Sequence, residues 1–204
     1  MPFPDLQSFI QELERQDQLK RIACEVDPIL EVTEIADRVS KSPAAGDAPP
    51  PSTDPVHGRC GGHGLLFDNV KGSDVPLGIN LYGSYERMRI ALGCESFETL
   101  ADRVQALVKP EMPMTLMDKM KKIPELVKIS GFSPKVVKNG MCQQVVRTDD
   151  ANLFDLPIIQ CWPEDGGRYI TFAGIYTKDP ETGSRNVGMY RVQVFEPKMT
   201  AMHW

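Results

Sequence analysis

The chain has 204 residues, of which 41% are hydrophobic and 25% are charged, and its formal net charge at pH 7 is −5. This composition is typical of a globular protein with a sizeable core, and the absence of a basic block or stripe argues against nucleic-acid binding. Because the N-terminus shows no export signal and no apolar run could span a bilayer, we expect a cytoplasmic protein whose five scattered cysteines are reduced thiols.

The first half of the chain alternates between helical and strand-like patterns. In chain order, we predict a helix at 5–16, a strand at 19–26, a helix at 31–41, a loop at 42–64, strands at 65–67 and 75–81, and helices at 85–92 and 96–108. Asp5 and Ser96 are suitable N-terminal caps for the first and the last of these helices. This order predicts a small α/β domain over residues 1–109.

The second half changes to a strand-rich pattern after a boundary marked by Pro110 and Pro113. An amphipathic, lysine-rich helix is predicted at 116–129, and strands are predicted at 136–137, 142–147, 169–176 and 187–195. The turn residues at 179–183 predict a hairpin between the last two strands. Residues 110–204 are therefore predicted to begin a β-barrel or sandwich, and the fold class is α+β.

Two weaker patterns have plain structural interpretations. His57, Cys60 and His63 have zinc-like spacing, but no convincing fourth ligand is nearby, so a Gly-rich flexible loop is favoured. The lysines of the 116–129 helix are better explained as a solvated face than as a site for an anionic partner.

The most informative block is the segment 186–191. On pattern alone, a simple antiparallel hairpin is the favoured interpretation. Three residues nevertheless suggest a ligand. Asn186 offers an amide at a strand start, and Gly188 leaves room for close approach in mid-strand. Arg191 could hold a phosphate or carboxylate through two parallel hydrogen bonds, so the segment suits an anionic cofactor.

A family resemblance follows from this block and from others in the same order. Residues 186–191 (NVGMYR), followed by 202–204 (MHW), resemble the cofactor-binding signature of the UbiD family of 3-octaprenyl-4-hydroxybenzoate carboxy-lyases. The segments 65–72 (LLFDNVKG), 80–84 (NLYGS) and 165–167 (DGG) resemble further parts of that family. The chain end at Trp204 directly follows a strand-like run, so we expect an N-terminal fragment.

The resemblance implies a fold and an activity. The fold is a small N-terminal α/β domain (1–109) followed by the first part of a split, FMN-binding, flavin-reductase-like β-barrel (110–204, truncated at 204). The activity is non-oxidative decarboxylation of aromatic or α,β-unsaturated carboxylic acids with prenylated FMN, a divalent metal (Mn²⁺) and K⁺. For the family's namesake the substrate is a polyprenyl-hydroxybenzoate in ubiquinone biosynthesis, which would place the protein at the membrane periphery. A flavin prenyltransferase would supply the cofactor, and the full-length form would be a homo-oligomer.

The resemblance also assigns roles position by position. Arg191 matches the arginine of the family's Glu-Arg-Glu catalytic network, and Asn186 matches its asparagine metal ligand. The positions that match cofactor-contacting residues are Thr171, Met189, Tyr190, Arg191, His203 and Trp204. In the family, the glutamate metal ligand and both catalytic glutamates lie further along the chain than Trp204. The 204 residues alone are therefore expected to be inactive.

Two alternatives remain beside the decarboxylase. The chain could be a non-catalytic subunit or assembly protein of a split carboxylase. It could also begin a plain FMN-binding reductase-like barrel that uses NAD(P)H. The N-terminal α/β domain and the lack of a strand–GxGxxG–helix pattern argue against the reductase.

Overall fold

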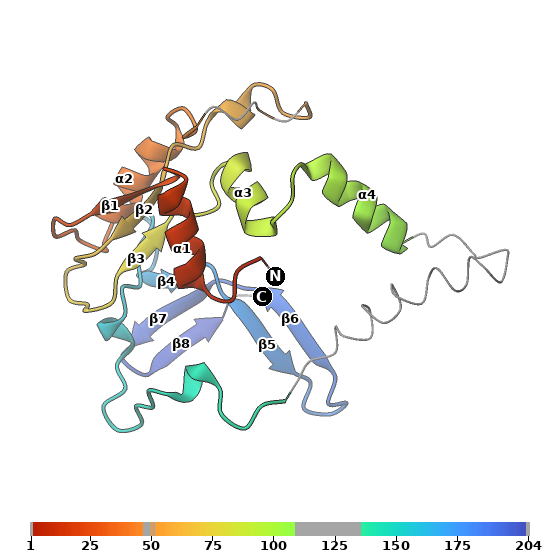
Figure 1. Ribbon diagram of the computed structural model, residues 1–204. Coiled ribbons are helices and arrows are strands. Elements are labelled where there is room, and N and C mark those ends of the chain that lie inside the picture. The colour runs from red at the N-terminus through yellow and green to blue at the C-terminus, as the bar shows by residue number, and fades with distance from the viewer. Residues whose placement is uncertain (1, 47–49, 51, 109–135, 203–204) are drawn as a thin grey trace, which may run out of the picture. The chain divides into compact units, whose positions relative to one another are not determined.

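The structure is a computed structural model, which describes residues 2–46, 50, 52–108 and 136–202 (Figure 1). The helices are α1 (Leu6–Arg15), α2 (Glu31–Ser40), α3 (Tyr85–Leu92) and α4 (Phe97–Val108). The strands are β1 (Leu19–Ile22), β2 (Gly64–Phe67), β3 (Leu77–Ile79), β4 (Arg168–Ile170), β5 (Gly174–Lys178), β6 (Arg185–Met189), β7 (Val192–Glu196) and β8 (Met199–Met202). One compact unit combines Met1–Glu95 with Asp150–Trp204, and Ser96–Asp149 forms a second unit.

Two helices, α1 and α4, begin at the capping residues that were predicted. The Asp5 carboxylate accepts a hydrogen bond from the backbone N–H of Ser8 at 2.7 Å and so caps α1. Ser96 accepts from the backbone N–H of Thr99 at 3.1 Å at the start of α4. A side-chain acceptor at this position satisfies one of the backbone donors that an α-helix leaves unpaired in its first turn.

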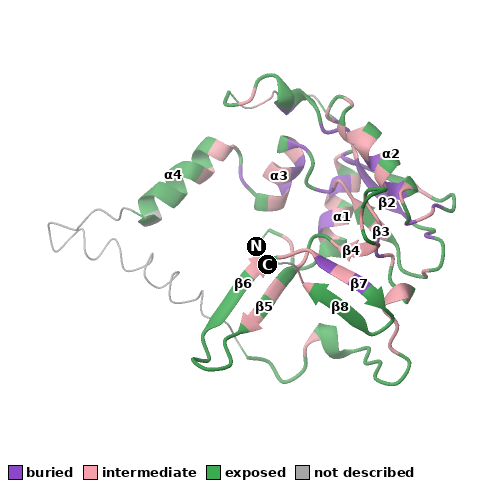
Figure 2. Cartoon of the chain, turned by 180° about the vertical axis from the view of Figure 1, so that it is seen from behind, coloured by how far each residue is buried: buried purple, intermediate pink, exposed green. Residues whose placement is uncertain are grey.

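The first sheet has the order β1-β2-β3, with β1 parallel and β3 antiparallel to the central strand. Every residue of β2 is buried because both faces of the strand are covered (Figure 2). Leu65 and Phe67 pack with residues of α2, whereas Leu66 packs with residues of α1 and α3. Two covered faces explain why β2 is a continuous apolar run rather than an alternating one.

Arg87, on α3, is the largest side chain that is fully buried in the described part of the chain. Its guanidinium donates to three backbone carbonyls, those of Gly61 at 2.7 Å, Gly62 at 2.6 Å and Asn80 at 3.1 Å. Burial lowers the pKa of Arg87 to about 10, so the side chain is still protonated at neutral pH. Arg87 therefore joins α3 to the segments that flank β2 and β3.

The strand-rich region forms an antiparallel sheet of order β4-β7-β8 and an antiparallel ribbon of β5 and β6 (Figure 1). The predicted hairpin is confirmed: Asp179 caps its turn by accepting from the backbone N–H groups of Glu181 and Thr182, both at 2.8 Å. The predicted α+β class is confirmed, and the residues that the structure describes form no closed barrel. Among those residues, no helix combines the length and apolar character needed to cross a membrane.

Several predicted elements were wrong. Residues 142–147 were predicted as a strand, but they contain part of a 3₁₀ turn, Met141–Gln143, and then irregular chain in which Val145 and Val146 are 78% and 72% exposed. Residues 136–137 are also not a strand. A strand needs a partner for its backbone hydrogen bonds, and an apolar pattern cannot supply one. The predicted 116–129 helix and the predicted domain boundary at 109 lie outside the described residues, so both stay predictions.

Candidate functional site

The candidate site lies at a break in a long antiparallel strand pair. Ile170 pairs with Val192 where β4 meets β7, and Gly174 pairs with Met189 where β5 meets β6. Three residues, 171–173, therefore lie opposite two residues, 190–191. These five residues interrupt the pairing, so that β4-β7-β8 and β5-β6 are separate sheets, and the interruption, residues 171–173 with 190–191, is called the bulge below. The strands predicted at 169–176 and 187–195 are each interrupted at this bulge.

Arg191, predicted as the catalytic residue, is held by contacts on two sides at the bulge. Its Nη1 and Nη2 donate to the two carboxylate oxygens of Asp165 at 2.9 Å and 2.6 Å. Its guanidinium carbon lies 3.9 Å from the centre of the Tyr169 ring. The hydrogen bonds from Arg191 lower the pKa of Asp165, and the bonds to Asp165 raise the pKa of Arg191. The guanidinium thus already makes the two parallel bonds to a carboxylate that its chemistry allows.

Sequence reasoning missed the residues that hold Arg191. Asp165 lies 26 positions away in sequence, and Tyr169 was placed only within a strand. The available signal was the 165–167 segment, an acidic residue followed by two glycines, which the family resemblance included without giving Asp165 a role. An ion pair between residues so far apart in sequence depends on the register of β4 against β7, and this register cannot be read from the sequence alone.

Asn186, predicted as a metal ligand, contacts Tyr190, the residue that follows β6. Its amide nitrogen donates to the Tyr190 hydroxyl at 3.1 Å. The tyrosine ring lies across Gly188, where an added Cβ would come within 2.5 Å of a ring carbon. The close approach predicted at Gly188 is therefore made by the Tyr190 ring. The hydrogen bond orients the Asn186 amide, since its nitrogen faces the tyrosine.

We expect Gly188→Ala to break the Asn186–Tyr190 hydrogen bond at little cost in stability. The new methyl group would displace only the ring of a side chain, so the free energy of unfolding should fall by less than about 1 kcal/mol. NMR of the Asn186 side-chain amide should show a changed chemical shift. Gly174→Ala is the control, because nothing lies within 4 Å of its added methyl group. An unchanged Asn186 signal in Gly188→Ala would contradict the arrangement.

The remaining predicted site residues lie around the bulge or outside the described residues. Thr171 is in the bulge and exposed, and Met189, at the end of β6, is 69% exposed. Phe172, between Thr171 and β5, contacts the ring of Tyr82 with 5.6 Å between ring centres. His203 and Trp204 are not described. The residues that hold Arg191 and Asn186 are Asp165, Tyr169 and Tyr190, and they do not include Thr171 or Met189.

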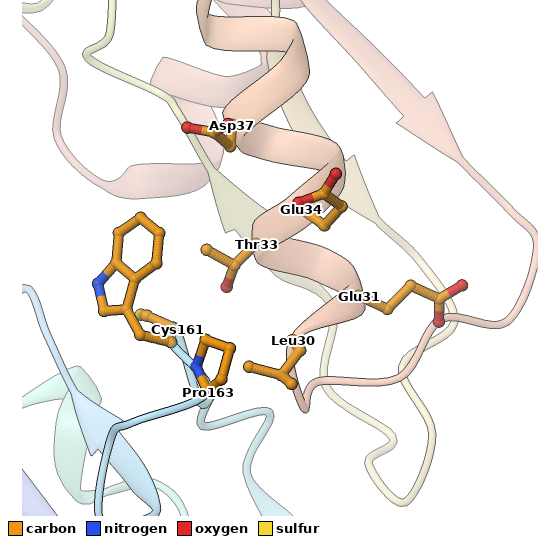
Figure 3. Close-up of a pocket in the computed structure, with 8 residues that line it drawn as sticks. Leu30, Glu31, Thr33, Glu34, Asp37, Cys161 and Pro163 are labelled. Atoms are coloured by element: carbon orange, nitrogen blue, oxygen red, sulfur yellow. The ribbon is translucent and has the colours of Figure 1, made fainter.

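A separate pocket of about 340 Å³ lies between the first turns of α2, from Leu30 to Asp37, and residues 161–163 (Figure 3). No predicted site residue lines it. Three carboxylates lie on its α2 side, but Glu34 pairs with Arg38 and Asp37 pairs with Lys41. We therefore assign no ligand to this pocket.

The described residues do not make a metal site. Among them, no group of three or more histidine, cysteine, aspartate or glutamate side chains is placed to hold a metal ion, and the zinc-like spacing of His57, Cys60 and His63 gives no such group. Asn186 offers a single amide oxygen, whereas hard cations take about six oxygen ligands. Any metal held by Asn186 would need ligands from beyond these residues.

Two family models match the chain. The 3-octaprenyl-4-hydroxybenzoate carboxy-lyase N-terminal domain matches residues 10–107, and the Rift-related domain of the same carboxy-lyase matches residues 135–204. A relative from Aquifex aeolicus (strain VF5) is 47% identical over 202 residues, which cover 99% of this chain and 38% of the relative. A relative from Archaeoglobus fulgidus is 40% identical over 204 residues, again covering 38% of the relative.

Solved structures show the same fold. The UbiD-class enzyme HmfF from Pelotomaculum thermopropionicum, in complex with FMN, matches with a TM-score of 0.69 and 25% identity over 98% of this chain and 36% of that chain. The apo 3,4-dihydroxybenzoic acid decarboxylase from Enterobacter cloacae matches with a TM-score of 0.70 and 23% identity over 100% of this chain and 37% of that chain. The chain thus spans little more than a third of the length of these relatives.

Proposed function

Since this chain belongs to the UbiD family of carboxy-lyases, we propose that the full-length protein is a prenylated-FMN-dependent, non-oxidative decarboxylase of aromatic or α,β-unsaturated carboxylic acids. The observation that carries the proposal is Arg191, a cation oriented by Asp165 at the bulge, inside the segment that matches the Rift-related domain. HmfF, whose fold is similar, has been solved with FMN and, in an evolved dimeric form, with prenylated FMN.

The side chains around the bulge fit an anionic, aromatic ligand. Arg191 carries five N–H donors and uses two of them for Asp165, so donors remain for a phosphate or a carboxylate. Phe172, in the bulge, and Met189, at the end of β6, are both exposed and offer apolar surface. Cofactor sites combine apolar side chains with a few placed polar groups, and these residues offer both kinds.

The roles proposed for the residues follow from their chemistry. Arg191 would hold the substrate carboxylate, and its charge would lower the pKa of a nearby carboxyl group. Prenylated FMN, when bound, supplies the electron-accepting chemistry, while the protein supplies orientation and electrostatics. We propose cofactor contacts at Thr171, Met189, Tyr190, Arg191, His203 and Trp204, and a metal contact at Asn186.

Further parts of the proposal concern the full-length protein. A flavin prenyltransferase would supply the cofactor, and Mn²⁺ and K⁺ would bind only with ligands beyond the described residues. We propose a cytoplasmic homo-oligomer, with a polyprenyl-hydroxybenzoate of ubiquinone biosynthesis as one substrate candidate. The 204 residues alone would be inactive, because one arginine cannot both bind the substrate and return a proton to the product.

The test is to express the full-length protein together with a flavin prenyltransferase and to measure carbon dioxide release from a panel of aromatic and α,β-unsaturated acids. We expect release from at least one acid, and no release when the prenyltransferase is omitted. A protein that carries no flavin and releases no carbon dioxide from any acid would contradict the proposal. Activity that depends on NAD(P)H and unmodified FMN would favour the reductase alternative.

A further inference from the structure

We infer that Asp165 is the positioning residue of Arg191, holding the guanidinium in one orientation so that its unused donors are ready for the anionic flavin. This inference rests on the proposed function, because it names a residue that prepares the same site. The family resemblance gives Asp165 no role, and the inference comes from the contacts of its side chain.

Asp165 and Tyr169 order the Arg191 guanidinium from two sides, and the Cys161 side chain is a further partner. Two parallel hydrogen bonds to Asp165, of 2.9 Å and 2.6 Å, fix its rotation within the guanidinium plane. The Tyr169 ring, 3.9 Å away, covers one face of that plane. A free arginine side chain samples many rotamers, and ordering it on binding weakens the affinity for a ligand. Here these contacts supply part of that ordering before any ligand binds.

Asp165 is itself firmly anchored, as a positioning residue must be. Its carboxylate also accepts from the backbone N–H of Trp162 at 3.2 Å, and its own backbone N–H donates to the Trp162 carbonyl at 3.1 Å. The next residue, Gly166, accepts from the Gln193 side chain at 2.9 Å, which ties this turn to β7. Only 11% of the Asp165 side chain is exposed, against 35% for Arg191. The carboxylate is therefore the fixed partner, and the arginine is the side chain that gains order.

Asp165 could instead compete with an anionic ligand, and the two roles predict opposite results. A competitor would have to leave Arg191 before the flavin bound, so its removal would tighten binding. The geometry favours positioning, because Asp165 occupies only two of the five guanidinium donors and is anchored by the Trp162 turn. Removing the carboxylate should therefore weaken binding.

The experiment measures the Kd of FMN for the full-length protein by quenching of flavin fluorescence. Asp165→Asn should raise the Kd about tenfold, because the arginine must then be ordered when the flavin binds. Asp165→Glu, which keeps a carboxylate, should recover part of that loss. Asp68→Asn is the matched control, since it removes the Arg21–Asp68 ion pair elsewhere in the chain and should leave the Kd unchanged.

The decisive comparison repeats Asp165→Asn in an Arg191→Ala background. If Asp165 acts through Arg191, the second substitution should not raise the Kd beyond that of Arg191→Ala alone. An equal rise in both backgrounds would show a purely structural role and overturn the inference, as would an unchanged or lower Kd for Asp165→Asn in the parent. A parent protein that binds no flavin would overturn the proposed function, whereas an FMN Kd that is the same in the parent and in Arg191→Ala would overturn this inference alone.

Discussion

Arg191→Lys in the full-length protein is expected to lower the rate of decarboxylation by a factor on the order of 10²–10³, the usual effect of removing one pre-oriented donor from an active site. Lysine keeps the positive charge, but its ammonium group cannot make two parallel bonds to Asp165 or lie flat on the Tyr169 ring. The charge would remain while its position was lost. The measurement is carbon dioxide release at saturating substrate, with the bound flavin quantified in the same samples.

Arg185→Lys is the matched control for this prediction. Arg185 opens β6 in the same hairpin and is exposed, so the identical chemical change there should leave the rate within about twofold of the parent. A rate for Arg191→Lys that stayed within a few-fold of the parent, at equal flavin content, would remove Arg191 from the catalytic site. A lower flavin content in Arg191→Lys alone would show that its main role is to bind the cofactor.

Arg87→Met is expected to reduce the free energy of unfolding by about 3–5 kcal/mol, because three hydrogen bonds from a charged donor, each contributing about 1.5–3 kcal/mol, are lost while the cost of burying the charge is removed. Methionine fills much of the volume but donates no hydrogen bond, so the carbonyls of Gly61 and Gly62 lose their guanidinium partner. These carbonyls flank β2, so the loss should loosen the first sheet. Urea denaturation followed by circular dichroism gives the change in free energy.

Arg38→Met provides the comparison for Arg87. Arg38 is on α2 and forms an exposed ion pair with Glu34, and pairs of this kind contribute only about 0.3–0.5 kcal/mol. A clear difference between the two variants is expected because only Arg87 is buried. Equal denaturation midpoints would show that the carbonyl contacts of Arg87 contribute little to stability.

The helices and the first sheet could be predicted because their signals are local. Asp5 and Ser96 supply caps within one turn of the residues they cap, and the apolar spacing of 31–41 is read from the same segment that forms α2. The apolar run Leu65–Phe67 marks β2 as a strand, although nothing in it shows that β1 is its parallel neighbour. The sequence therefore predicts which segments are helices and strands, but not which strands pair with one another.

The strand-rich region shows where local signals end. The apolar pattern of 142–147 suits a strand, yet Val145 and Val146 remain exposed. At 169–176 and 187–195 the strands do form, but the prediction makes each of them continuous through the bulge, where the pairing is interrupted. Only the pairing of Ile170 with Val192 and of Gly174 with Met189 reveals the extra residue. Hydrogen-bond pairing between distant segments decides both cases.

The candidate site was predicted as a set of residues but not as an arrangement. Asn186, Gly188 and Arg191 were selected for their chemistry, and their partners differ from those expected. Tyr190 fills the space over Gly188, and Asp165 takes the two parallel bonds predicted for a ligand. Asp165 had been given no role, and Tyr190 had been predicted to contact the cofactor rather than Asn186 and Gly188. Which side chains meet in the folded chain does not follow from their suitability as ligands.

A crystal structure of the full-length protein loaded with prenylated FMN would test the central claim most directly. We expect the flavin at the bulge, in contact with Met189 and within hydrogen-bond distance of the Arg191 guanidinium, while Arg191 still makes both bonds to Asp165. A flavin bound away from residues 171–173 and 190–191, or an Arg191 side chain turned away from both the flavin and Asp165, would contradict it.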